Sequence, residues 1–71
     1  MKVVGTCEEG VFLVALDETQ GVVYDRETGR IGRPMNIQSI IARGYWKRPE
    51  RADAEQALRD FLATPSGAAY R

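Results

Sequence analysis

Histidine is absent from this chain of 71 residues, and there is a single cysteine, Cys7. Histidine is the commonest general base and a frequent zinc ligand, so its absence argues against acid–base catalysis and against a zinc site. One cysteine excludes an internal disulfide framework. We expect Cys7, within a predicted strand, to be a small buried apolar residue rather than a nucleophile. The sequence therefore predicts a protein that is not an enzyme and uses neither a metal nor a cofactor.

Long hydrophobic runs are also lacking, since the longest one, VFLVAL, covers only residues 11–16. A membrane-spanning helix needs about 20 apolar residues. The apolar run in the N-terminal segment MKVVGTCEEG is too short for a signal peptide. These features, with the single free thiol, predict a soluble cytoplasmic protein that does not enter a membrane.

The length of the chain allows one small domain, which we expect to span residues 1–65 and to be followed by a flexible C-terminal tail, residues 66–71. Apolar residues make up 44% of the sequence and charged residues 28%, a composition typical of a globular protein. A chain of this size buries only about 60% of its unfolded surface, so binding to a larger partner would add stability that the core alone cannot supply.

The first half of the sequence predicts an antiparallel β-meander of about four strands, at residues 2–8, 11–16, 22–26 and 30–33. The run 11–16 is apolar at every position, which is typical of a central strand covered on both faces. The predicted turns are Glu9-Gly10, the segment 17–21 with Gly21 at positive φ, and the segment 25–29 closed by its glycine. Pro34 should end the fourth strand because proline cannot donate to a ladder.

The second half predicts one or two short helices. Residues 36–43 have isoleucines at helical spacing, Asn36 as N-cap and Gly44 after the C-terminus, although a fifth strand stays possible because isoleucine favours strands. A C-terminal helix should start at a capping box formed by Asp53 and Gln56, and a Glu55–Arg59 pair should support it. Its apolar stripe should pack on the sheet: Ala54, Ala57, Leu58, Phe61 and Leu62. The predicted fold class is α+β.

Charge is segregated along the chain although the net charge is zero. Residues 1–25 carry five acids against one base, a net of −4, whereas residues 26–51 carry seven bases against two acids, a net of +5. Such asymmetry indicates an interaction surface. The basic stretch also contains the only tryptophan beside a tyrosine, and aromatic and arginine side chains often dominate the energy of interfaces. The candidate partner-binding residues are Arg30, Arg33, Arg43, Tyr45, Trp46, Lys47, Arg48 and Arg51.

Two roles stay open for Trp46, as a wall of the core or as part of the contact surface. The predicted function is that of a non-catalytic regulatory binding protein, of a phage or bacterial type, which docks on an acidic surface of a larger intracellular complex, with RNA polymerase as the first candidate. The alternative is a module that binds RNA or single-stranded DNA by stacking bases on Tyr45 or Trp46. The sequence decides neither the direction of the regulation nor the oligomeric state.

Overall fold

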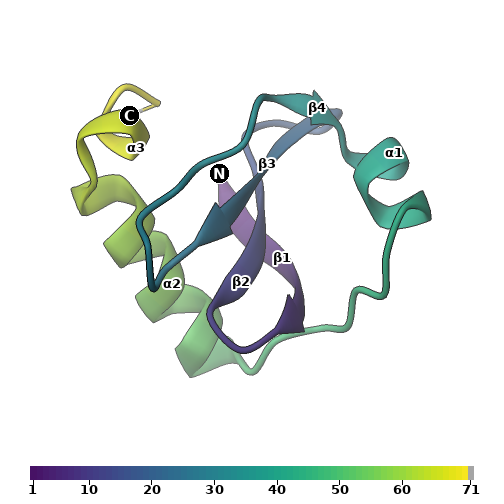
Figure 1. The fold of residues 1–71 in the computed structure, drawn as a ribbon, viewed down its shortest axis with the longest axis horizontal. Coiled ribbons are helices and arrows are strands. Elements are labelled where there is room, and N and C mark those ends of the chain that lie inside the picture. The colour runs from purple at the N-terminus through teal and green to yellow at the C-terminus, as the bar shows by residue number, and fades with distance from the viewer. Residues whose placement is uncertain (71) are drawn as a thin grey trace.

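The sheet and its flanking helices are formed by residues 1–70, the part of the chain that the computed structural model describes. The strands are β1 (Lys2–Glu8), β2 (Val11–Ala15), β3 (Gln20–Asp25) and β4 (Met35–Asn36), and the helices are α1 (Ile37–Ala42), α2 (Arg51–Ala63) and α3 (Pro65–Ala68). Figure 1 shows the sheet between α1 on one side and α2 with α3 on the other. The predicted α+β meander is confirmed: the four strands lie in sequence order, every neighbouring pair is antiparallel, and α2 contacts the sheet.

The hairpin turns follow from local chemistry. Gly10 and Gly29 have φ values of +82° and +76°, a left-handed conformation that glycine adopts without steric cost. In the turn between β2 and β3, by contrast, Gly21 lies inside β3 with no positive φ, so its predicted role was wrong. The Asp17 carboxylate makes this turn instead, since its Oδ1 accepts from the backbone N–H groups of Thr19 at 2.8 Å and Gln20 at 2.7 Å.

The fourth strand lies later in the chain than predicted. Residues 30–33 make only an isolated bridge, between Ile31 and Tyr24, and β4 begins after Pro34 rather than ending before it. Proline lacks the N–H group that a ladder needs, so the pairing with β3 is interrupted at Pro34 and resumes at Met35.

The predicted helix at residues 36–43 is confirmed as α1, and the fifth-strand alternative is wrong. The Asn36 Oδ1 accepts from the N–H groups of Gln38 at 2.9 Å and Ser39 at 3.3 Å, which satisfies two of the free donors at the start of a helix. Gly44 follows the C-cap residue, but its backbone does not take the left-handed conformation.

Helix α2 begins two residues before the predicted capping box. Its N-cap is Glu50, directly after Pro49, and Asp53 lies in the first turn. The predicted Glu55–Arg59 pair is also wrong, because Glu55 bonds Arg51 one turn earlier, at 3.1 Å. Both errors have one cause, which is that the helix includes the turn following Pro49.

Both faces of the sheet are covered near its centre. On the α2 face, Phe12, Val14, Val22 and Tyr24 pack against Phe61 and Ala57, and the rest of the predicted helical stripe is partly buried on this core. On the other face, Leu13 is buried under α1 and its C-terminal extension. The double coverage predicted for residues 11–16 is therefore confirmed over β2, where four of five residues are buried.

The C-terminal segment continues the core. Gly67 lies against the Phe61 carbonyl so closely that a Cβ atom would overlap it, and the Tyr70 ring stacks on Phe61 with centroids 5.9 Å apart. The predicted flexible tail, residues 66–71, overlaps α3, and its last residue lies outside the described range.

Candidate functional site

The segment between α1 and α2, residues 43–50, carries most of the predicted site residues and is called the connector here. It is fixed at two points. The Trp46 Nε1–H donates to the Ile40 carbonyl of α1 at 3.0 Å. One residue later, Lys47 and Thr6 of β1 exchange two backbone hydrogen bonds of 2.9 Å each. The connector is thus held to a helix at one residue and to the edge of the sheet at the next.

Trp46 is half-buried and completes the second face of the sheet. Its ring lies over Gly5 of β1, where an added Cβ atom would already be in van der Waals contact with the ring at 3.4 Å. Its indole N–H reaches the Ile40 carbonyl in the last turn of α1, where it satisfies one of the acceptors at the end of the helix. Of the two roles predicted for Trp46, the structure therefore places it in the supporting one, with part of the ring still reachable from solvent.

Tyr45 points away from the fold. Its side chain is 95% exposed, more than any other large apolar residue in the described chain. The neighbouring Trp46 is anchored, so the backbone that carries Tyr45 is held although its ring touches little. Such a ring offers rigid contact area at a low entropic cost.

The predicted cations divide into two sets. Arg43, Lys47 and Arg48 are exposed on the connector and make no ion pair within residues 1–70. Arg51 starts α2 and pairs with Glu55 at 3.1 Å, while remaining highly exposed.

Arg30 and Arg33 lie elsewhere. Ile31 between them bridges to Tyr24 of β3, whereas Lys47 bridges to β1, an outer strand that β2 separates from β3. Arg26, which contributes to the positive stretch in the sequence, is used inside the fold: it lies over the Phe12 ring at 5.2 Å and 3.8 Å from the Asp60 carboxylate. The predicted cations from residue 43 onward thus lie on the connector or at the start of α2, whereas Arg30 and Arg33 belong to the segment between β3 and β4.

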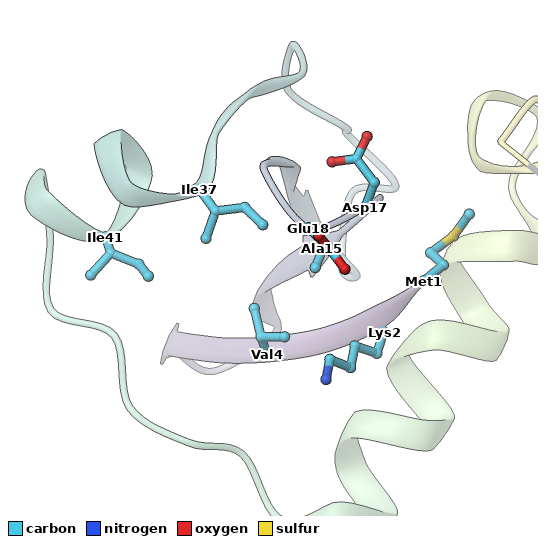
Figure 2. A pocket seen from close by; sticks show the side chains of 8 residues that line it. All are labelled: Met1, Lys2, Val4, Ala15, Asp17, Glu18, Ile37 and Ile41. Atoms are coloured by element: carbon cyan, nitrogen blue, oxygen red, sulfur yellow. The ribbon is translucent and has the colours of Figure 1, made fainter.

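An apolar groove that sequence reasoning missed lies between β1, β2 and α1, with a volume of about 530 Å³. Figure 2 shows Val4 on β1 and Ile37 and Ile41 on α1 around the same space, with acidic side chains from the β2–β3 turn at its rim. Ile41 is 41% exposed, so α1 covers this end of the sheet incompletely. The groove is lined by Met1, Lys2, Val4, Ala15, Asp17, Glu18, Ile37 and Ile41.

A second groove, here called the basic groove, runs between β1 and the start of α2, with a volume of about 440 Å³. Three of its lining residues are cations and none is acidic, and Lys2 comes from the otherwise acidic N-terminal part of the sequence. No local pattern predicts this meeting, because it depends on where β1 lies in the sheet. The lining residues are Lys2, Val3, Val4, Arg48, Pro49, Arg51 and Ala54.

Cys7 is exposed, so its predicted burial was wrong. It follows Thr6 at an irregularity of the β1–β2 ladder and lines a small apolar hollow together with Ile40 of α1, Arg43 and Trp46. Among residues 1–70, no group of three or more His, Cys, Asp or Glu side chains could hold a metal ion.

Within residues 1–70, two ionisable groups have shifted pKa values. The backbone N–H groups of Gln20 and Thr19 lower the pKa of Asp17, so the rim of the apolar groove carries a full negative charge at neutral pH. Burial raises the pKa of Tyr24, and the nearby Asp60 carboxylate adds to the increase. Tyr24 therefore stays a neutral core residue.

No helix in the described part of the chain has the length and apolar character needed to cross a membrane. Comparison with known proteins found no matching family model, curated protein or solved structure.

Proposed function

We propose that this protein is a non-catalytic regulatory binding protein of the cytoplasm, which docks through its connector on an acidic surface of a larger protein complex. The observation that carries the proposal is the placement of Tyr45, a 95% exposed aromatic ring between cations that have no ion pair within residues 1–70. A ring this exposed adds little to the stability of the fold. Tyrosine and arginine are the residue types that most often supply binding energy at protein interfaces.

The anchoring of the connector supports the proposal further. Hydrogen bonds from Trp46 to α1 and from Lys47 to β1 hold the backbone on the C-terminal side of Tyr45 before any partner arrives. Binding then costs less conformational entropy than it would for a free loop. Arg43 and Arg48 flank the ring and can pair with carboxylates, which also steer the encounter at low salt.

Acidic side chains beside the connector favour a protein partner over a nucleic acid. A polar hollow of about 630 Å³ places Lys47 and Arg48 next to four acids, Glu8, Glu9, Glu50 and Asp53. A protein surface can match this mixture of charges, whereas a phosphate backbone is repelled by the acids. We take RNA polymerase as the first complex to test, because its large surface presents patches of both signs.

The decisive experiment is a quantitative pull-down with three matched baits, followed by mass spectrometry. The baits are the wild type, Tyr45→Ala and Arg30→Glu, and the lysate is treated with nuclease. We expect RNA polymerase subunits to be enriched by the wild type and by Arg30→Glu but not by Tyr45→Ala, with equal melting temperatures for all three. A set of captured proteins that does not change with Tyr45→Ala would refute the proposal.

The nucleic-acid alternative is tested on the same variants. Fluorescence anisotropy with labelled mixed-sequence single-stranded DNA and RNA, at two salt concentrations, should show only weak binding. If the protein binds these nucleic acids, and if the binding falls steeply with salt and is abolished by Tyr45→Ala, the partner is a nucleic acid and not a protein.

A further inference from the structure

The outer edge of β1 is open over residues 2–4. β1 is the first strand of the sheet, so only β2 pairs with it along its length. On the outer side, the backbone bonds within residues 1–70 join β1 to the connector at Thr6 alone. An unpaired edge of this kind is a template for another strand.

Pro49 explains why the connector does not cover this edge. In the antiparallel register set by Thr6 and Lys47, the next hydrogen-bonded pair of a regular ladder would use Pro49, which has no N–H to donate. The irregularity of β1 between Val3 and Gly5 also breaks this register on the strand side, so the ladder stops after one bridge. The backbone of residues 2–4 is thus left without an outer partner from the connector.

The two grooves described above meet at this open edge, one on each face of the sheet. Lys2 and Val4 line both of them. The apolar groove lies on the α1 face, with Ile37 and Ile41 in its wall, and the basic groove lies on the α2 face, with Ala54 in its wall.

The charges around the two grooves favour different side chains of a partner. Asp17 and Glu18 at the rim of the apolar groove repel a carboxylate, while its isoleucines accept an apolar group. The basic groove contains Lys2, Arg48 and Arg51 and no acid, so it attracts a carboxylate. Successive side chains of a strand point to opposite faces of a sheet, so one added strand can serve both grooves.

We propose that the β1 edge binds an extended segment of a partner protein whose residues alternate between apolar and acidic, as an added strand of the sheet. The apolar side chains enter the apolar groove and the acidic ones the basic groove, while main-chain hydrogen bonds join the segment to residues 2–4. The inference rests on the proposed function and names the part of the partner that this second surface recognises.

Charge also argues against a second copy of this chain as the occupant. A β1–β1 pair would bring the Lys2 of one copy to the basic groove of the other, where Arg48 and Arg51 already lie. Like charges at such short range oppose pairing. A partner of opposite charge is therefore the better fit.

The test uses a fluorescein-labelled hexapeptide that alternates valine and glutamate, with both ends blocked. The control peptides alternate valine and lysine, or carry the same three valines and three glutamates in two blocks. Fluorescence anisotropy should show binding of the alternating acidic peptide only. Amide hydrogen exchange should slow within residues 2–4 on binding, because the open edge of β1 gains a main-chain partner.

Variants of the chain separate the two grooves. Arg48→Glu should weaken binding of the acidic peptide about tenfold, since it places a carboxylate in the basic groove and lowers the charge of its lining from +3 to +1. Ile41→Asp should also weaken binding of the acidic peptide, because it places a carboxylate in the wall of the apolar groove. Arg30→Glu, at the other side of the sheet, is the matched control and should change nothing.

The outcomes distinguish this inference from the proposed function. Tyr45 lines neither groove, so Tyr45→Ala should keep full peptide affinity while it abolishes capture of the larger complex. Equal affinity for the block peptide, no effect of Arg48→Glu, or dimerisation through β1 in sedimentation equilibrium would overturn the edge site. If the peptide fails to bind while Tyr45-dependent capture persists, the edge inference falls and the proposed function stands.

Discussion

Trp46 is the residue whose substitution best separates a role in the fold from a role in binding. It contacts Gly5 of β1 and donates to the Ile40 carbonyl, whereas the next residue in the chain, Tyr45, is 95% exposed. The two aromatic side chains therefore make a matched pair. Trp46→Ala should destabilise the protein, and Tyr45→Ala should leave its stability unchanged.

The size of the Trp46 effect follows from the contacts it loses. A largely covered aromatic ring buries on the order of 150 Å², which at about 25 cal/mol per Å² corresponds to roughly 4 kcal/mol. Since the ring is only half-buried, we expect Trp46→Ala to cost about 3 kcal/mol, at the low end for such truncations. A domain of this length is stable by roughly 4–11 kcal/mol, so the loss is a large fraction of the total.

Trp46→Phe isolates the hydrogen bond from the packing. The ring contact with Gly5 is mostly kept, but the donor to the Ile40 carbonyl is lost. That carbonyl also accepts from the Arg43 backbone N–H, at 3.2 Å, so it keeps one partner. We therefore expect a cost of about 1 kcal/mol.

Thermal unfolding followed by far-ultraviolet circular dichroism measures these differences without relying on tryptophan fluorescence. For a domain of this size, 1 kcal/mol shifts the melting temperature by about 4–8 °C. The melting temperature of Trp46→Phe should be lower than that of the wild type by this amount, and that of Trp46→Ala by at least about twice as much. The melting temperature of Tyr45→Ala should not change measurably. A melting temperature of Trp46→Ala equal to that of the wild type would show that the ring does not support the fold, and the supporting role of Trp46 would be refuted.

Two further predictions concern the sheet and its turns. Gly21→Ala should lower the free energy of unfolding, measured in urea, by about 1–3 kcal/mol, because the added Cβ would lie 3.0 Å from the Val14 carbonyl oxygen and 3.1 Å from Ile37 Cγ1. Gly5→Ala, whose added Cβ has its nearest contact at 3.4 Å, should lower it less. Equal urea midpoints for the two variants would contradict this. Asp17 has a lowered pKa in the folded state, so its contribution to stability is present above its ordinary pKa of 3.8 and is lost as the pH falls through the folded value. Asp17→Asn should therefore be less stable than the wild type at neutral pH, with a gap that closes in acid, and a gap independent of pH would contradict the assignment.

The strands and most turns could be predicted because their causes are local. Gly10 and Gly29 take the left-handed conformations that their turns need, and the uninterrupted apolar run at 11–16 becomes a strand buried on both faces. The α2 stripe needs only helical periodicity to place Ala57 and Phe61 in the core. In each case the determining residues lie within a few positions of one another.

The errors arise where distant pairing overrides local pattern. Gly21 resembles a turn glycine in sequence, but in the sheet it pairs with β2 on one side and with β4 on the other. The absence of a side chain at this position leaves room for Ile37. Cys7 lies in a strand as predicted, but it is exposed at an irregularity of the β1–β2 ladder, where the regular alternation of side chains is broken. Neither outcome can be read from residues nearby in the sequence.

The candidate site was predictable in part for the same reason. The exposed aromatic and the cations of residues 43–48 are adjacent in the chain, so their clustering needs no tertiary information. Arg30 and Arg33 share the positive sign but belong to the β3 side of the sheet, as the bridge from Ile31 shows. Lys2 joins the basic groove only because β1 is the strand to which the connector returns.

The connector links the stability of the fold to the availability of both proposed binding surfaces. Lys47 must pair with Thr6 for the connector to return to β1, and this pairing holds Trp46 over the second face of the sheet while Tyr45 is turned outward. Two residues later, Pro49 has no N–H with which to continue the same pairing, and the edge of β1 over residues 2–4 stays free. A connector without the Lys47 bridge would lose its fixed aromatic ring, whereas one without Pro49 could continue the ladder and cover the edge. The order of a pairing residue followed by a proline is therefore what allows one eight-residue segment to complete the fold and still present two surfaces to a partner.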